Sequence, residues 1–169
     1  MKLLLHICCG PCAIYPIEVL KSKNIDITGF FYNPNIHPID EFNRRRDNVA
    51  KLSLEAGLNV IYEDDFQQEV WKTFAKDDES RCNYCYSLRL NHTFEYAKQN
   101  SYDAVSTSLL VSPYQKHDLI IETCKKLSTQ YGVDFFYHDF REGFRKGQQS
   151  AKDMGLYRQK YCGCILSLR

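Results

Sequence analysis

The cysteines are the residues of this sequence with the clearest capacity for chemistry. Seven of the eight fall into three tight groups along the chain. The groups are Cys8, Cys9 and Cys12; Cys82 and Cys85; and Cys162 and Cys164. Clustered thiolates bind iron–sulfur clusters or zinc, and closely spaced pairs also exchange disulfides. The eighth, Cys124, shares a helical stripe with Ile120 and Leu127, which predicts a small buried core residue.

The length and composition of the chain do not call for cysteines as a source of stability. With 169 residues, of which 44% are hydrophobic, we expect one domain, residues 1–169, that buries about 70% of its unfolded surface without covalent staples. We find no secretory signal and no apolar run long enough to span a membrane. We therefore expect a cytoplasmic protein with no membrane partner, where clustered cysteines bind metal or carry out redox chemistry.

The first two cysteine groups occupy positions that suit such chemistry. Cys8, Cys9 and Cys12 come where a buried strand ends and a helix begins, which is the edge at which open α/β sheets bind ligands. The positive N-terminus of that helix lowers thiol pKa values. Cys82 and Cys85, predicted in a polar loop or first helical turn, are spaced so that both sulfurs can face one metal.

The third group, Cys162-Gly163-Cys164, has two interpretations. A disulfide across one intervening residue is strained and readily reduced, as a catalytic or relay disulfide should be. The same two thiols could instead be ordinary metal ligands. Seven thiols exceed the four ligands of one zinc ion, whereas an iron–sulfur cluster takes four and leaves three for a second metal or a redox pair. The pattern therefore favours iron–sulfur over zinc.

Two other functions remain open at this point. The tetrapeptide from Cys9 to Cys12, CGPC, lies between a strand and a helix and matches the active site of thioredoxin-like thiol–disulfide oxidoreductases. The second alternative is a zinc-stabilised RNA-binding module. Although the net charge is only +1, residues 141–169 carry seven basic side chains against two acidic ones, interleaved with Phe144, Tyr157 and Tyr161. This mixture suits phosphate contacts and base stacking, but a solvated helix face has the same composition.

Strand and helix patterns alternate along the chain and would bring the cysteine groups together. The predicted strands are Lys2–Cys8, Ile27–Tyr32, Asn59–Glu63, Tyr102–Thr107 and Val133–His138. The predicted helices are Ala13–Lys23, Ile39–Ala56, Phe66–Ala75, Asn83–Gln99 and Pro113–Tyr131. This alternation predicts about five parallel strands flanked by helices, an α/β fold whose strand ends share one edge.

Polar residues follow two further strands at that edge. Asn33, Asn35 and His37 lie in the stiff loop NPNIHP after the second strand, either as substrate contacts or as parts of a rigid turn. Asp139 and Arg141 end the last strand; the carboxylate could ligate iron, carry protons or cap the next helix.

Six motifs, read in order, resemble the QueH type of epoxyqueuosine reductase over essentially the whole chain. They are HICCGPC, YNPNIHP, RCNYCYSLRL, TSLLVSPYQKH, DFREGF and LYRQKYCGC. The resemblance implies a tRNA-modifying oxidoreductase that performs the last step of queuosine biosynthesis, in which the epoxide of epoxyqueuosine at the wobble position is reduced to queuosine. It also implies a parallel doubly wound sheet similar to the adenine-nucleotide α-hydrolase (HUP-like) core, with the cysteine loop in place of the phosphate loop and no ATP chemistry.

The same resemblance assigns roles to individual residues. Cys8, Cys9, Cys82 and Cys85 match the ligands of a [4Fe–4S] cluster, and Cys162 and Cys164 match a redox-active disulfide. A second, mononuclear iron would draw on Cys12, Asp139, Cys162 or Cys164, which gives Cys162, Cys164 and Asp139 as catalytic candidates. Asn33, Asn35, His37, Arg141, Arg158 and Lys160 are the candidates for substrate and tRNA binding. No flavin or nicotinamide motif is visible, so we expect electrons from an external donor such as ferredoxin or flavodoxin.

Overall fold

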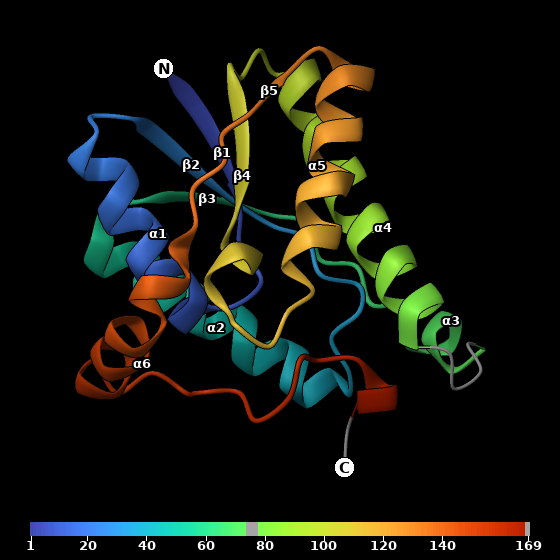
Figure 1. The fold of residues 1–169 in the computed structure, drawn as a ribbon. Helices are drawn as coiled ribbons and strands as arrows, with labels where there is room; N and C mark the ends of the chain where they lie inside the picture. The colour runs from blue at the N-terminus through green and yellow to red at the C-terminus, as the bar shows by residue number, and fades with distance from the viewer. Residues whose placement is uncertain (74–77, 168–169) are drawn as a thin grey trace.

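The structure is a computed structural model that describes residues 1–73 and 78–167 (Figure 1). Five parallel strands form one sheet in the order β3-β2-β1-β4-β5. They are β1 (Lys2–His6), β2 (Asp26–Phe31), β3 (Asn59–Tyr62), β4 (Ala104–Thr107) and β5 (Asp134–Phe135). The predicted parallel, doubly wound sheet is therefore confirmed. Because the strand order reverses between β1 and β4, a crevice opens at their carboxyl ends, the usual ligand site of such sheets.

Helices cover both faces of this sheet (Figure 1). The first face carries α1 (Gly10–Ser22) and α2 (Ile39–Ala56), with α6 (Phe144–Asp153) packed on α1. The second face carries α4 (Asp78–Gln99) and α5 (His117–Tyr131), and the short α3 (Gln68–Lys72) precedes α4. Three 3₁₀ turns complete the chain: η1 (Ser108–Val111), η2 (Phe140–Gly143) and η3 (Ile165–Ser167). In the described residues, none of the helices has the length and apolar character to cross a membrane.

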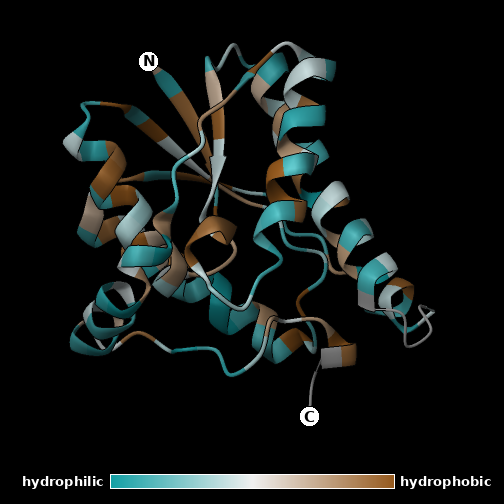
Figure 2. Cartoon of the chain, viewed as in Figure 1, coloured by the Kyte–Doolittle hydropathy of each residue, from teal (hydrophilic) through white to brown (hydrophobic). Residues whose placement is uncertain are grey.

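The alternation of side chains along β1 divides the core into two layers. Leu3 and Leu5 join the hydrophobic cluster under α1 and α2, whereas Leu4 joins the cluster under α4 and α5. All three leucines are fully buried. In Figure 2 the strands contain hydrophobic stretches, whereas α6 is mostly hydrophilic and the coil that follows it is mixed. The central strand is therefore held from both sides, which fixes the position of the turn that follows it.

The structure corrects several predicted boundaries. Strand β1 ends at His6 rather than Cys8, because the Cys8 amide donates to the Ser108 hydroxyl instead of continuing the ladder. Helix α4 already starts at Asp78, so Cys82 and Cys85 lie within a helix. The helix predicted over Phe66–Ala75 is seen as Gln68–Lys72, and residues 74 and 75 lie outside the described residues.

Two further differences concern the second half of the chain. Helix α5 begins at His117 rather than Pro113, because residues 112–115 form a turn. Strand β5 covers only Asp134–Phe135 instead of six residues. Helix α6 was not predicted at all. Its buried residues include the small Gly147 and Ala151, and the rest of the helix is mostly polar, so its sequence has no apolar run of the kind that marked the other helices.

Candidate thiol-rich site at the carboxyl edge of the sheet

The first thiol group lies on the turn between β1 and α1. The sulfurs of Cys8, Cys9 and Cys12 all lie within 4.8 Å of one another, and all three residues are buried. Cys9 caps a helix that starts at Gly10, where an added Cβ would lie 3.3 Å from both the Cβ and the carbonyl oxygen of Asn48 on α2. This tight packing of α1 against α2 holds the three sulfurs together. Such a group can bind a metal.

Hydrogen bonds concentrate negative charge on one sulfur of this group. The pKa of the Cys8 thiol is held well below its usual value, because Cys12 and Cys9 donate to its sulfur, with further help from Arg89 and Ser108. Burial raises the pKa of Cys9, and hydrogen bonding to Cys8 and Cys9 raises that of Cys12. Of these three thiols, Cys8 is therefore the one whose pKa its neighbours lower.

A second thiol group in the structure combines the two cysteines of α4 with the two cysteines near the end of the chain. Cys82, Cys85, Cys162 and Cys164 line one small cavity of about 30 Å³. Cys85 and Cys164 are buried against Trp71, whereas Cys162 is exposed. Burial raises the pKa of Cys85 to about 11, while Arg89 acts in the opposite direction. Within the described part of the chain, none of the eight cysteines forms a disulfide.

Arg89 connects the two thiol groups. Its guanidinium donates to the Cys85 sulfur over 3.4 Å and to Asn33 Oδ1 over 3.0 and 3.2 Å. Asn33 in turn donates to the carbonyl of Ile7, 2.9 Å away. Arg89 is only 3% exposed. Burial lowers its pKa, but the charges of Cys85 and Cys8 outweigh this effect and raise it, so a cation is held between the groups.

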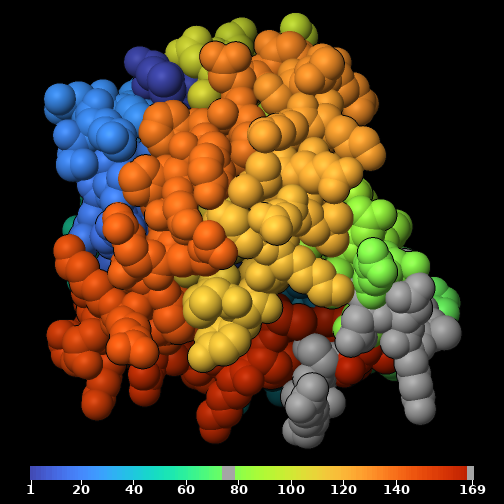
Figure 3. All heavy atoms as spheres, in the orientation of Figure 1, coloured from blue at the N-terminus to red at the C-terminus, as the bar shows by residue number. Residues whose placement is uncertain are grey.

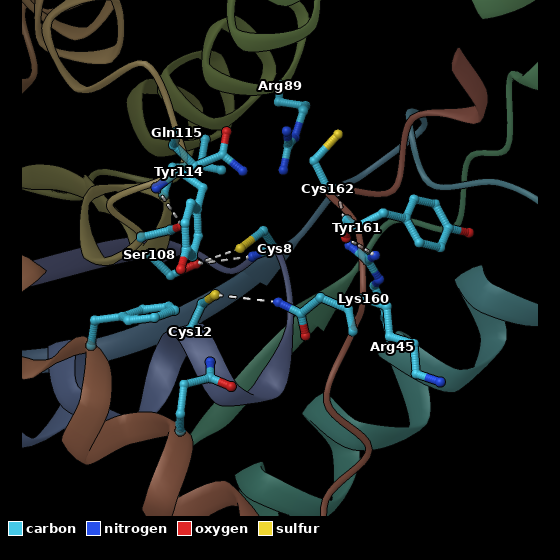
Figure 4. Close-up of a pocket in the computed structure, with 15 residues that line it drawn as sticks. Cys8, Cys12, Arg45, Arg89, Ser108, Tyr114, Gln115, Lys160, Tyr161 and Cys162 are labelled. Carbon is cyan, nitrogen blue, oxygen red and sulfur yellow. Dashed lines mark hydrogen bonds between the residues drawn. The ribbon is translucent and has the colours of Figure 1, made fainter. Parts of the chain in front are cut away.

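A larger cavity of about 370 Å³ opens in front of the thiols (Figure 4). Cys8 lies near its centre in the view, with Cys12 and Ser108 on one side and Cys162 on the other. Further lining residues are Arg45, Arg89, Tyr114, Gln115, Phe144, Gln148, Gln159, Lys160 and Tyr161. The two cavities share Arg89, Gln115 and Cys162. Six of the seven clustered cysteines thus line one or the other of these two cavities, and Cys9 lies beside Cys8 and Cys12. The predicted core position of Cys124 on α5, which is fully buried, is confirmed.

The C-terminal strap, residues 155–164, carries Cys162 and Cys164 to this edge. Arg45 on α2 donates to the carbonyls of Tyr161, 2.6 Å away, and Cys162, 3.0 Å away, while its Nε pairs with Glu41 at 3.0 Å. The Tyr161 hydroxyl donates to the carbonyl of His37, whose own amide donates to Gly163 over 2.8 Å. The strap is therefore held by side chains and loop backbone rather than by a strand or helix.

The strap also places Gln159 against the first thiol group. Its Nε2 donates to the Cys9 sulfur over 2.9 Å and to the Cys12 sulfur over 3.5 Å. Its Oε1 is buried and has no hydrogen-bond partner in the described residues. The strap carries Cys162 and Cys164 of the second thiol group and thus also contacts the first group, which lies far away in the sequence.

The predicted binding residues divide between the site and its surroundings. Lys160 lines the large cavity and Asn35 lines the small one. Asn33 and His37 are fully buried and hold Arg89 and the strap, respectively. Arg158 is exposed on the strap.

Asp139 and Arg141 are not brought to either cavity. Asp139 caps η2 by accepting from the Arg141 amide, and its carboxylate pairs with the Arg141 guanidinium at 2.7 Å. That pairing lowers the pKa of Asp139 to about 2. The capping alternative is therefore observed, and a catalytic role for Asp139 stays a prediction.

Four residues that hold the thiols were not singled out from the sequence: Arg45, Arg89, Ser108 and Gln159. Three of them lie in quoted motifs, Arg89 in RCNYCYSLRL, Ser108 in TSLLVSPYQKH and Gln159 in LYRQKYCGC. Arg45 lies between two other arginines, and only the fold shows that it is the buried one.

Fold and site together define a parallel, doubly wound α/β protein with a thiol-rich site in the turn after its first strand. Two solved structures share this fold. The U34-tRNA thiolase NcsA from Methanococcus maripaludis, with its [4Fe-4S] cluster, has a TM-score of 0.63 and 15% identity over all of this chain and 62% of its own. A predicted subunit of tRNA methyltransferase from Methanocaldococcus jannaschii has a TM-score of 0.58 and 12% identity over 90% of this chain and 74% of its own.

The chain belongs to the family of epoxyqueuosine reductase QueH, whose model matches residues 3–169. The epoxyqueuosine reductase QueH of Dehalococcoides mccartyi is 36% identical over 98% of this chain and 92% of its own length. That of Thermotoga maritima is also 36% identical, over 98% of this chain and 89% of its own. The family membership expected from the six motifs is therefore confirmed.

Proposed function

We propose that this protein reduces the epoxide of epoxyqueuosine at the tRNA wobble position to queuosine, with electrons delivered through a thiolate-bound [4Fe–4S] cluster. The observation that carries the proposal is the convergence of seven cysteines from three distant segments at the switch point of the sheet. Family membership supplies the reaction class. The clustered thiols and the family membership thus support the same function.

The residues present fit such a cluster. A [4Fe–4S] cluster takes four thiolates, and the proposed ligands Cys8, Cys9, Cys82 and Cys85 come two from each thiol group. Cys12 lies within 4.8 Å of Cys8 and Cys9 at its sulfur, so it is available beside them. Cys12, Cys162 and Cys164 remain as ligands of a second, mononuclear iron or, for the last two, as a redox-active disulfide. Buried Arg89 offsets part of the negative charge that several thiolates accumulate.

The reaction sets clear demands on the other residues of the site. Converting an epoxide to an alkene releases its oxygen as water and takes two electrons and two protons. The cluster, when bound, would supply the electrons from an external donor such as ferredoxin or flavodoxin. Ser108, 3.2 Å from the Cys8 sulfur, and Gln159 orient the thiols by hydrogen bonds. Lys160 and Arg45 add positive charge to a cavity that must admit RNA.

The test is anaerobic reconstitution followed by metal analysis, visible absorption and an epoxide reduction assay on tRNA that contains epoxyqueuosine, with a chemical reductant. We expect four or more irons per chain, because the cluster itself holds four. Cys82→Ala should lose both the cluster absorbance and the reduction. Cys124→Ala is the matched control, because its thiol lies in the core away from the site, and it should keep both. A colourless protein with stoichiometric zinc and no turnover would contradict the proposal and favour the zinc-stabilised RNA-binding module.

The geometry gives less support to a thioredoxin-like oxidoreductase that uses Cys9 and Cys12. Such enzymes need an accessible thiolate with a lowered pKa. Cys9 is 1% exposed and Cys12 5% exposed, and the pKa of each thiol is raised. Both sulfurs also accept from Gln159 of the strap. Attack on an external disulfide would require this strap to move away.

A further inference from the structure

The mouth of the large cavity carries an aromatic side chain whose exposure is unusual. Tyr114 is 85% exposed, although it lines the same cavity as the buried Cys8 and Cys12. Its backbone is held in place: its amide donates to Ser112 Oγ over 3.2 Å, and the next amide donates to the carbonyl of Ser112. A large ring on a fixed turn, displayed to solvent, is suited to contact with a flat partner.

A second aromatic ring faces it from α6. The rings of Tyr114 and Phe144 lie 5.8 Å apart at 80°, in an edge-to-face arrangement. In the space-filling view, the yellow segment after β4 stands beside orange α6 and the red strap at the lower edge of the molecule (Figure 3). The cavity mouth is thus bordered by two rings from segments that are distant in the sequence.

Each of the two segments that carry these rings also carries a glutamine. Gln115 follows Tyr114, and Gln148 lies one helical turn after Phe144 on the same face of α6; both line the cavity. Gln115 Oε1 accepts from the Tyr86 hydroxyl over 2.5 Å, which leaves its NH₂ group as the donor toward the cavity. Glutamine amides can pair with the polar edge of a nucleobase while a ring stacks on its face.

The charge of the cavity is also suited to RNA. Of the described residues that line it, three are cationic, Arg45, Arg89 and Lys160, and none is a carboxylate. The absence of carboxylates from this lining is notable because the chain as a whole has 21 acidic residues against 22 basic ones. A polyanionic ligand therefore meets cationic side chains but no carboxylate at this opening.

We propose that Tyr114 and Phe144 form a stacking rim that receives the wobble base, turned out of the anticodon loop, so that its epoxide-bearing substituent reaches the thiols. The inference rests on the proposed function and adds the residues that hold the base. The aromatic faces would bind the ring system of the base, and Gln115 and Gln148 would contact its polar edge. Unstacking the base from the loop has a cost that stacking on Tyr114 offsets.

The closing experiment measures binding to two anticodon stem–loop RNAs that differ only at the wobble position, where one has guanosine and the other an abasic residue. Fluorescence anisotropy with a label at the far end of the stem, at one fixed salt concentration, gives both affinities for the reconstituted protein. We expect wild type to bind the guanosine RNA about 5- to 150-fold more tightly, the range for one stacked base. Tyr114→Ala should lower this ratio several-fold and leave the affinity for the abasic RNA unchanged.

Three variants make the result specific. Tyr114→Phe keeps the ring and should keep the ratio. Phe144→Ala should lower it, and Tyr137→Ala, an exposed tyrosine that does not line the cavity, should leave it unchanged. In the reduction assay, Tyr114→Ala should raise KM with little change in kcat, because stacking holds substrate and transition state equally. Iron content equal to wild type shows that the variants fold.

The proposed stacking rim is contradicted if wild type binds the two RNAs equally, or if Tyr114→Ala leaves the ratio of the two affinities unchanged. Either result can occur in a protein that still reduces the epoxide, so the rim can fail while the proposed function stands. Conversely, a protein that discriminates through Tyr114 but does not reduce the epoxide would support the rim and contradict the proposed reaction.

Discussion

The thiols of the β1–α1 turn and those of the C-terminal strap border the same cavity but are held there by different means. Cys8, Cys9 and Cys12 are fixed by backbone, at the end of a central strand and the start of a helix. Cys162 and Cys164 lie on a segment without strand or helix, which side chains from α2 and the backbone of the β2–α2 loop hold in place. Cys162 is exposed, whereas the three thiols of the turn are buried.

Because the two regions are held differently, they suit two different functions at a metal site. The backbone of the β1–α1 turn is fixed by the sheet, so its cysteines have constant positions as metal ligands. A strap held by polar contacts can release a thiol without unfolding the domain, as a redox pair or substrate-facing ligand requires. We therefore expect substitutions in the turn to remove the cofactor and substitutions in the strap to affect its use.

The largest effect is expected from changing one thiol in each region. Cys8→Ala should lose cluster absorbance and lower turnover by more than about 100-fold, because loss of a ligand exceeds the effect of its hydrogen-bonded neighbours. Cys162→Ala should lower turnover to a similar extent but retain the cluster absorbance. Iron analysis and the epoxide assay give both quantities. Equal loss of iron in the two variants would show that the turn and the strap hold one common metal centre. It would contradict the expectation that only the turn is needed to retain the cofactor.

The next effect concerns the anchor of the strap. Arg45→Gln removes one partner of a buried ion pair, whose side chains are 3% and 6% exposed, and should lower the free energy of unfolding by about 3–5 kcal/mol. Urea unfolding measures this change. Mass spectrometry after maleimide treatment should show faster labelling of Cys164, because the strap that buries it is released.

Arg44 provides the matched control, because it is the neighbouring residue on α2, is exposed and lies over the ring of Tyr157 rather than in a buried ion pair. Arg44→Gln should change the stability by less than about 0.5 kcal/mol. If Arg45→Gln behaves like Arg44→Gln in both measurements, the strap is held by contacts other than this arginine.

The same contrast explains what the sequence could predict. The strand, turn and helix around Cys8 have local signals, namely an apolar run followed by Gly10 and Pro11, and the predicted position at the sheet edge was right. The five strands were found for the same reason. The position of Cys124 in the core also followed from a local helical stripe.

Contacts between distant segments left no such signal. That Arg45 rather than Arg44 or Arg46 holds the strap depends on how α2 is rotated in the fold. For Asn33 and His37 the sequence left open whether they contact substrate or form a rigid turn, and only the structure shows that they hold Arg89 and Gly163. Helix α6 was missed because its buried face includes the small residues Gly147 and Ala151.

A smaller effect is expected at the glycine between the strap cysteines. Gly163 has φ +111°, and an added Cβ would lie 3.0 Å from both Arg45 Nη1 and Ile36 Cγ1. Gly163→Ala should therefore cost about 2–3 kcal/mol in urea unfolding. Gly57→Ala is the control, because Gly57 has φ +62° but open space around its Cα; it should cost about 1 kcal/mol. Equal costs would mean that strain alone, rather than the close approach of the strap to α2, requires glycine here.

The smallest effect is expected from the two exposed cations of the strap, Arg158 and Lys160. If each contacts one phosphate, the double variant Arg158→Ala with Lys160→Ala should weaken tRNA binding about tenfold and reduce the slope of log K against log salt by about 1.4–1.8. The stability should not change, because neither side chain anchors the strap. The control is Lys125→Ala with Lys126→Ala on α5, which removes the same charge from a helix away from the cavity. An unchanged slope in the strap variant would place the RNA elsewhere, and the strap would then serve the thiols alone.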